Sequence, residues 1–422
     1  MNRVIALRMI GFSSARAVPA LISMAFVAVL VRSLGARNYA YLSLATAIAN
    51  TCATICSGWI AQGVLRYLPG RPERNKSVGG ALRLAVILAV GATLASCLLG
   101  ALVLLPPGVR WELAPGTCIL SAVMMLQAVW MARVMVSGKS GVYAGSEIAR
   151  SGAMLGLALL LGKLGGLELG TAVWVYIVSY LAAIGLLHAF EGKGRSAQQC
   201  AAEDGRSDYI RRAWLGRLWS FGSPMSFWLG IMVSLPLIDR AILISGIGAT
   251  DAGIYAASYD LFFRVASMLF GPVLMVLHPH IMRQINTGRR AMAARWVYGA
   301  FAAALVLSPL VALAVSFAAK PVAAMLGLSS GRIPFGVAFL LTLGGCLWQT
   351  ALVAHKFLEM QRRTGLLLLC LVVSVGIHAL LVMCLSPVYG SAGAASAAVC
   401  GACIYCVLTL ACGHVKVTRG TQ

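Results

Sequence analysis

Charged residues are scarce in this sequence, and acidic residues are the scarcest of all. Asp and Glu together number 12 in 422 residues, and all charged types make up 11% of the chain, against about a quarter in soluble domains. Two long stretches, 84–109 and 365–415, carry no charge when histidine is counted as neutral. A soluble core of this size cannot bury so much apolar surface, so the composition predicts a polytopic membrane protein.

The sequence also lacks the patterns that carry catalysis. It has no phosphate-cradling P-loop motif, and no long loop holds an acidic pair or a Ser/His/Asp set. The 12 cysteines fall mostly in apolar runs, where cysteine acts as a small apolar residue. Even the evenly spaced Cys400, Cys403 and Cys406 have no fourth ligand beside them. We therefore predict no enzyme activity, no cofactor and no metal site.

The net charge of +22 would favour a nucleic-acid partner in a soluble protein. Here there is no soluble basic domain that could bind one, so we expect no nucleic-acid partner. In a membrane protein the positive charge reports topology, because Lys and Arg accumulate in cytoplasmic loops. Counting them over successive loops places most on the side of the N-terminus. This distribution predicts a multi-pass protein with both termini in the cytoplasm.

Long apolar runs are what the sequence has in excess. A spanning helix needs about 20 apolar residues, and on that basis the chain contains about 12 spans. We predict an all-α protein with these helices: 12–32, 39–62, 79–105, 114–136, 143–162 and 168–190 in the first half, and 216–238, 252–277, 294–317, 333–354, 365–386 and 392–413 in the second.

The longest polar stretch divides these helices into two equal sets. Residues 191–215 are rich in Gly, Ser, Gln and mixed charge, which is typical of a cytoplasmic linker. A weak internal repeat supports the same division, since Leu34–Asn38 is echoed by Ile247–Asp251 about half a chain later. We predict two six-helix lobes, 1–190 and 216–422, around a central cavity, which is a transporter layout.

Several short motifs resemble one known family. The segments concerned are a Leu-Gly turn before a helix start at 34–42, a second copy at 248–255 with Gly253 and Tyr255, a Gly-rich segment ending in Arg at 58–67, Asp239-Arg240, and Tyr389-Gly390. In order and spacing they resemble bacterial O-antigen and exopolysaccharide flippases of the multidrug/oligosaccharidyl-lipid/polysaccharide exporter superfamily. The first copy departs from the pattern, because Ala40 and Leu42 stand where the family has Gly and Tyr.

The resemblance implies a flippase in the bacterial inner membrane. Its substrate would be an oligosaccharide linked to undecaprenyl diphosphate, moved from the cytoplasmic to the periplasmic leaflet by alternating access and coupled to an ion gradient. Besides this substrate and membrane lipids, the implied partners are a polysaccharide polymerase and the chain-length machinery. Two alternatives stay open: a cation-coupled multidrug exporter of the same superfamily, and a membrane-embedded polymerase or ligase, which would need a large periplasmic loop.

Charged residues inside the predicted spans are the candidate functional residues, because a charge at the bilayer centre costs at least a few kcal/mol. Arginine suits a diphosphate, since its planar fork meets phosphate oxygens in pairs. We predict substrate binding by four arginines, ion coupling by two carboxylates and gating by three residues near the periplasmic ends. These sets are Arg16, Arg66, Arg150 and Arg264; Asp260 and Glu147; and Arg32, Asp239 and Arg240.

Two of these candidate pairs have a purely structural alternative. Asp260 and Arg264 are four residues apart and Glu147 and Arg150 are three apart, so on a helix each pair shares a face and forms an ion pair. Such a pair either neutralises itself or lines a cavity. His378 inside a predicted span is interpreted as a packed histidine.

Overall fold

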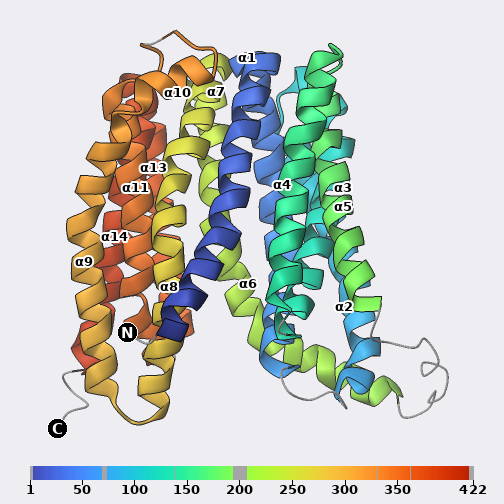
Figure 1. The fold of residues 1–422 in the computed structure, drawn as a ribbon, viewed down its shortest axis with the longest axis vertical. Helices are drawn as coiled ribbons and strands as arrows, with labels where there is room; N and C mark the ends of the chain where they lie inside the picture. Colours follow the sequence, from blue (N-terminus) through green and yellow to red (C-terminus); the bar gives the residue numbers. More distant parts are fainter. Residues whose placement is uncertain are drawn as a thin grey trace. The chain divides into compact units, whose positions relative to one another are not determined.

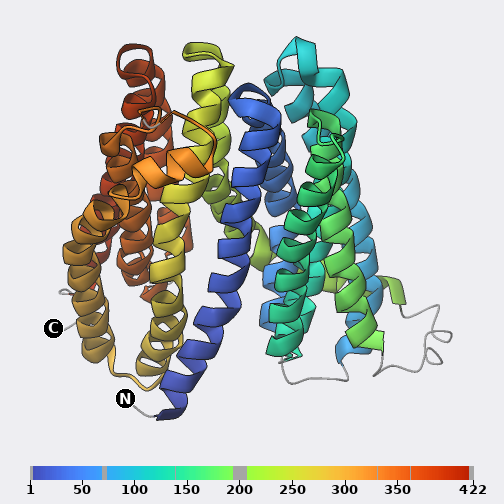
Figure 2. The same ribbon diagram turned by 45° about the horizontal axis from the view of Figure 1, so that its top comes forward.

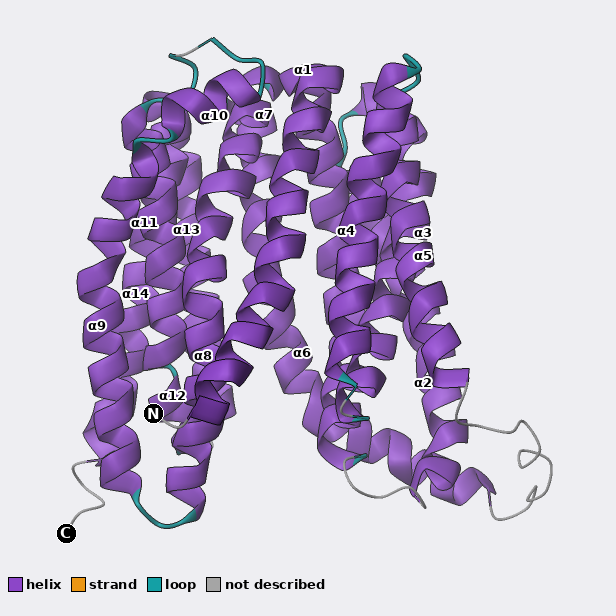
Figure 3. Ribbon diagram, viewed as in Figure 1, coloured by secondary structure: helices purple, strands orange, loops and turns teal. Residues whose placement is uncertain are grey.

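The computed structural model describes residues 3–68, 74–137, 139–192, 207–329, 331–361 and 363–417. Over these residues the chain is helical with short loops, and no strand occurs in them (Figure 3). The prediction of an all-α polytopic fold is confirmed. Its helices are α1 (Arg3–Tyr67), α2 (Arg74–Leu104), α3 (Pro107–Val136), α4 (Ser140–Lys163), α5 (Leu169–Gly192), α6 (Ser207–Gly246), α7 (Ala249–Ser258), η2 (Tyr259–Phe263), α8 (Arg264–Asn286), α9 (Arg290–Ser316), α10 (Ala319–Met325), α11 (Phe335–Ala354), α12 (Lys356–Met360), α13 (Thr364–Tyr389) and α14 (Ser391–Val417).

The helices match the expected number of spans once α1 is divided into two and α7, η2 and α8 are joined into one. In the described part of the chain, 10 helices are long and apolar enough to cross a membrane. The first of them, Ala17–Tyr67, has 51 residues and is broken by non-helical geometry at Gly35, so it provides two spans. The run from α7 through η2 to α8 adds another. All 12 predicted spans therefore correspond to helical segments.

The chain forms two compact units whose limits cut through α1 and α6. Unit 1 contains Met1–Ala40 and Ile238–Gln422, and unit 2 contains Tyr41–Leu237. From the sequence we predict two lobes, 1–190 and 216–422, with a linker at 191–215, and this division stays a prediction. Residues 193–206 of the predicted linker lie outside the described residues, and α6 already begins at Ser207.

In unit 2, α1 and α6 approach each other closely at glycines of both helices. A Cβ at Gly222 would meet the backbone of Trp59, and one at Gly58 would meet Ser226, whose hydroxyl donates to the Ile55 carbonyl at 2.5 Å. Apolar residues of α1, α2, α3 and α6 pack into one cluster around this crossing. Gly58 and Gly222 thus allow the two helices to pack closely, and a larger side chain at either position would push them apart.

Unit 1 is built around α11, the most buried of its long helices. In the most apolar 18 residues of the span Phe335–Met360, 72% of the residues are buried. The same share is 22% for the span in α9. α11 packs against α14, α9, α8 and η2, and α13 packs against α14. Figures 1 and 2 show α9, α11, α13 and α14 side by side, with the short α10 crossing one end of this group.

The internal repeat seen in the sequence has a backbone counterpart. Gly35 has φ 74° and ψ 161°, and Gly248 has φ 89° and ψ 154°. Both values lie in a region that is nearly restricted to glycine. The Leu-Gly and Ile-Gly turns of the two echoed segments therefore share one conformation, and each starts the helix that follows it.

One predicted helix boundary is wrong and matters for the site. The helix expected at 216–238 continues to Gly246, although Pro224 and Pro236 lie inside it. Asp239 and Arg240 were expected near its periplasmic end. They lie instead about 10 Å from that end, at 1.5 Å per residue, and both are buried.

Candidate functional site: a buried ionic network in unit 1

Asp260 contacts three polar side chains of unit 1. Its Oδ2 accepts hydrogen bonds from Arg240 Nη2 at 2.8 Å and from the Tyr39 hydroxyl at 2.8 Å. Its Oδ1 lies 2.9 Å from Arg264 Nη2, which confirms the predicted Asp260–Arg264 ion pair. Two arginines and one phenol thus surround a carboxylate whose side chain is 6% exposed.

A π-helical turn carries this carboxylate. Residues Tyr259–Phe263 form η2, between α7 and α8, and the Tyr259 and Phe263 rings stack at 4.4 Å between centroids. A π-turn adds a residue to the helical ladder, and such turns occur often at functional sites. Here the turn places Asp260 toward α6 and α1, where Arg240 and Tyr39 lie.

Asp239, the neighbour of Arg240, has separate partners. Its Oδ1 lies 2.7 Å from His378 Nε2, and its Oδ2 accepts a hydrogen bond from the Tyr255 hydroxyl at 2.8 Å. Asp239 and His378 side chains are each 1% exposed. His378 is therefore a buried residue, as expected, but it contacts a carboxylate as well as the apolar core.

The two arginines on Asp260 differ sharply in exposure. The Arg240 side chain is 6% exposed and the Arg264 side chain is 53% exposed. Arg240 is buried inside unit 1 and needs the Asp260 carboxylate, because a buried charge requires its counter-charge. Arg264 keeps about half of its side chain at the surface of unit 1.

The second predicted pair lies in unit 2. Arg150 Nη2 lies 2.7 Å from Glu147 Oε2, as predicted, and Gln127 donates to Glu147 Oε1 at 3.1 Å. The Arg150 guanidinium also lies over the Tyr180 ring, 5.0 Å from its centroid. Both charged side chains keep partial exposure, 16% and 22%.

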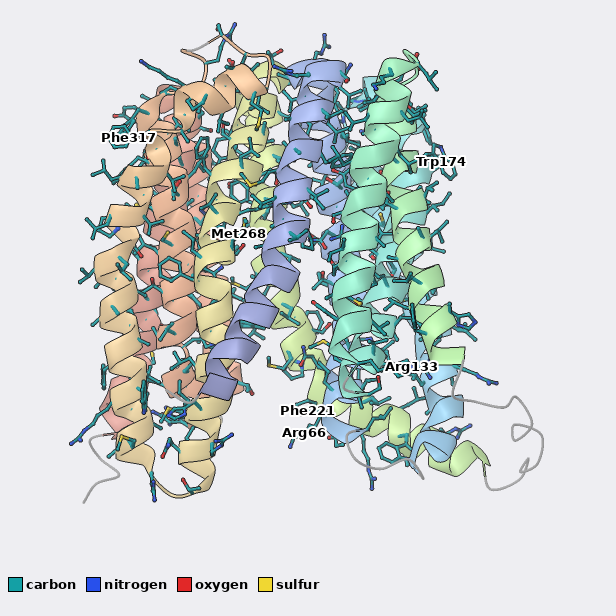
Figure 4. All side chains as sticks on the ribbon, viewed as in Figure 1. Arg66, Arg133, Trp174, Phe221, Met268 and Phe317 are labelled. Atoms are coloured by element: carbon teal, nitrogen blue, oxygen red, sulfur yellow. The ribbon has the colours of Figure 1, made fainter. Side chains whose placement is uncertain are left out.

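The remaining predicted residues lie apart from these clusters. Arg66, in the last turn of α1, lies over the Phe221 ring at 4.1 Å from its centroid (Figure 4). Arg32 donates to the Ala324 carbonyl at 3.0 Å, at the end of α10, where a cation interacts favourably with the last carbonyls of a helix. Arg16 lies in α1, and its side chain lies outside the described residues.

The structure therefore brings together Arg240, Asp260 and Arg264 from three different predicted sets, and leaves Arg66, Arg150 and Arg32 elsewhere. Sequence reasoning missed the hydroxyls of Tyr39 and Tyr255 and the pairing of His378. One signal was available for the histidine. A lone Asp and a lone His inside apolar spans are each costly, so they are expected to find each other.

Comparisons with known proteins agree on the fold. No protein-family model matches the sequence, and no curated protein matches it. Among solved structures, an inward-facing multidrug resistance MATE family transporter of the MOP superfamily has a TM-score of 0.72 at 13% identity, covering 95% of both chains. An outward-facing one has a TM-score of 0.63 at 14% identity, with 98% of this chain and 95% of that chain covered. The Vibrio cholerae MATE transporter VcmN has a TM-score of 0.63 at 15% identity, with 99% and 98% covered. The chain thus has the fold of MATE transporters.

Proposed function

We propose that the protein is a transporter of the bacterial inner membrane that works by alternating access and is coupled to an ion gradient. The observation that carries this proposal is the fold match over 95% of both chains to a MATE transporter. The solved neighbours include inward-facing and outward-facing conformations, which is what alternating access requires of a fold. The protein acts on its substrate by moving it rather than by changing it.

The position of Arg264 supports a water-lined path. It follows Ala249, the start of the continuous α7–η2–α8 run, by about 22 Å of helix, which is past the midplane of a hydrocarbon core about 30 Å thick but still inside it. An exposed charge at that depth is tolerated when it faces water or a polar ligand, not lipid tails. The exposed half of Arg264 therefore supports a polar passage beside α8.

The first candidate substrate class is that of the structural neighbours. Three of the matching solved structures are named as multidrug transporters, so drug export is the class that the comparisons favour. An organic cation would bind a carboxylate. Asp260 of unit 1 and Glu147 of unit 2 are the carboxylates that the sequence assigns to ion coupling, and a cation would compete with Arg264 for the first and with Arg150 for the second.

The second candidate is the undecaprenyl-diphosphate-linked oligosaccharide, and a specific observation favours it. Asp260, Asp239 and Glu147 each already contact an arginine or histidine within 2.9 Å. A cationic drug would have to displace one of these partners, whereas a diphosphate can use the exposed surface of Arg264. A flippase of this kind would hand its substrate to the polysaccharide polymerase and chain-length machinery.

Two growth-based assays distinguish drug export from lipid-linked oligosaccharide flipping. The protein is expressed at matched levels in a drug-susceptible bacterium without its own MATE exporters, and in a strain without its own O-antigen flippase. Drug export raises the concentrations of cationic dyes needed to stop growth; flipping restores long-chain polysaccharide on the cell surface. A folded protein that does neither would contradict both substrate proposals.

Arg264→Ala is expected to reduce transport by roughly tenfold or more in whichever assay responds, because a charge-assisted hydrogen bond to an ionic substrate contributes about 1.5–3 kcal/mol. Protein level and thermal stability should stay close to those of the wild type, since Arg240 still pairs with Asp260. Arg332→Ala is the matched control, because it removes another exposed arginine of unit 1 that pairs with an aspartate. Equal transport by both variants would remove Arg264 from the substrate path.

A further inference from the structure

One face of α5 in unit 2 has the composition of a surface that contacts lipid tails. The helix carries no Lys, Arg, Asp or Glu from Leu169 to Phe190, and its Trp174, Val178 and Leu181 are each about half exposed. Their spacing of four and three residues places these three side chains on one face. An exposed apolar face without any charge suits the hydrocarbon core, where charged groups are strongly disfavoured. We therefore take this face as the lipid-facing side of α5.

Helix lengths indicate where this face reaches the lipid headgroups. His188 follows Leu169, the start of α5, by about 28 Å of helix, which is close to the thickness of a hydrocarbon core of about 30 Å. On α3, Trp111 and Trp130 are also about 28 Å apart along the helix, as expected of tryptophans in the two headgroup layers. His188 and Trp130 therefore lie at one headgroup layer, on the side that the distribution of Lys and Arg assigns to the cytoplasm.

At this layer three segments of unit 2 bring basic groups together. The Arg133 guanidinium of α3 lies over the Trp130 ring, 5.2 Å from its centroid, and the centroid of the His188 ring of α5 lies 5.3 Å from that of the same ring. Lys139, directly before α4, donates from Nζ to the Phe190 carbonyl near the end of α5 at 3.0 Å. Arg133 is partly exposed, and Lys139 and His188 are exposed. Figure 4 shows Arg133 toward this end of unit 2. Arg133, Lys139 and His188 form what we call the basic cluster.

Apolar packing beneath the basic cluster holds its helices together. The buried Leu187 of α5 packs with Met131 and Val134 of α3, and the partly buried Trp130 packs against the same group. Phe190, in contrast, is 48% exposed. The surface is thus amphipathic, with cations at the headgroup layer and apolar side chains next to them, as the boundary between the headgroups and tails of a lipid requires.

The basic cluster has donors that the protein does not use. Among the described residues, the Lys139 ammonium contacts a backbone carbonyl and not a carboxylate. An ammonium has three N–H donors, so two stay available for an anion. Glu191 is the next residue after Phe190, and its side chain lies outside the described residues. The described part of the cluster is therefore cationic, exposed and complementary to an anion.

We propose that the basic cluster binds the phosphate of an anionic glycerophospholipid in the cytoplasmic leaflet. The Arg133 guanidinium meets phosphate oxygens in pairs, the Lys139 ammonium adds a second cation, and the N–H of the His188 ring adds a further donor. The acyl chains lie along the uncharged face of α5. This proposal goes beyond the proposed function, because it holds whichever molecule is transported.

The charge of the cluster favours an anionic lipid over a zwitterionic one. Phosphatidylcholine carries its own ammonium beside the phosphate, and Arg133 and Lys139 would repel this group. The headgroup of phosphatidylglycerol is an uncharged glycerol, so the phosphate charge is not compensated within the lipid. Each Lys or Arg close to a membrane surface strengthens binding to anionic lipid by roughly fivefold.

The test locates the bound lipid by photochemical labelling. The purified full-length protein in detergent is mixed with phosphatidylglycerol that carries a photoreactive diazirine on its headgroup, and labelled peptides are identified by mass spectrometry after illumination. Label is expected in the segments 130–139 and 185–190. Unlabelled phosphatidylglycerol should compete about tenfold better than phosphatidylcholine. Sodium phosphate and sodium chloride of equal ionic strength should reduce labelling equally, because the site takes a lipid and not free phosphate.

Variants assign the label to the cluster. Arg133→Gln combined with Lys139→Gln should reduce labelling of these segments by about tenfold or more, at an unchanged temperature of unfolding. Lys139→Arg keeps the charge and should keep the labelling, and so should Glu191→Gln, which removes an acid. The control is Arg83→Gln combined with Arg212→Gln, which removes the same charge from exposed positions of α2 and α6 and should leave labelling of the two segments nearly unchanged.

Several results would overturn the proposal. Equal loss of label in the two double variants means general attraction by surface charge, and equal competition by the two lipids means that the headgroup charge is not recognised. Label confined to other segments, or no specific label, places no lipid at the basic cluster. Displacement by sodium phosphate beyond that by sodium chloride means a site for free phosphate. No transported molecule enters the test, so its outcome and that of the substrate assays are independent.

Discussion

Asp260→Ala is expected to destabilise unit 1 by about 3–5 kcal/mol, because it leaves Arg240 buried without its counter-charge. The Arg240 side chain is 6% exposed and has no route to water comparable to that of Arg264. A loss of this size should lower the midpoint of thermal unfolding by roughly 10 °C. The measurement is fluorescence-detected size-exclusion chromatography of the protein in detergent after heating over a series of temperatures.

Two controls separate loss of charge pairing from loss of packing. Asp251→Ala removes an aspartate whose side chain is 59% exposed and 3.6 Å from Arg332, and it should change stability by less than about 0.5 kcal/mol. The double variant Asp260→Leu with Arg240→Met replaces the buried pair by apolar side chains and should recover much of the loss. If Asp260→Ala unfolds at the same temperature as Asp251→Ala, the buried pair does not stabilise unit 1.

The parts of this site that could be predicted from the sequence are those that depend on residue spacing within one helix. The Asp260–Arg264 and Glu147–Arg150 pairs lie four and three residues apart, and helical spacing alone places each pair on one face. The spans follow from apolar length in the same way. In each case the information lies within a single helix.

The rest of the network depends on contacts between distant segments. Tyr39 and Asp260 are 221 residues apart, and His378 and Asp239 are 139 apart. No periodicity within one helix reports such contacts. The prediction that the helix at 216–238 ends before Asp239 is wrong for a related reason. The adjacent charges of Asp239 and Arg240 suggest a helix end at the membrane surface. Their partners on other helices instead offset the cost of burial, and α6 continues to Gly246.

One short segment connects the sequence resemblance to the packing of unit 1. Gly253 and Tyr255 are the two positions of the second motif copy that match the family pattern. In the structure the Tyr255 hydroxyl donates to Asp239, and Gly253 allows α7 to touch the α1 turn. In the first copy, Ala40 and Leu42 stand at the corresponding positions, and both are buried apolar residues.

Gly253→Ala is expected to be strongly destabilising for its size, at the upper end of the about 1–3 kcal/mol typical of overpacking. The added Cβ would meet the carbonyl oxygen and carbon of Ala36, and a backbone group cannot rotate aside as a side chain can. α7 would have to move away from the α1 turn, and this movement would stretch the Tyr39–Asp260 hydrogen bond.

In a double-mutant cycle, Tyr39→Phe should therefore cost about 1 kcal/mol in the wild type and clearly less beside Gly253→Ala. Gly299→Ala in α9, where a Cβ would have nothing within 4 Å, is the control and should be neutral or slightly stabilising. Equal unfolding midpoints for the two glycine variants would mean that the α1–α7 contact yields without cost, and the close approach would then not explain the glycine.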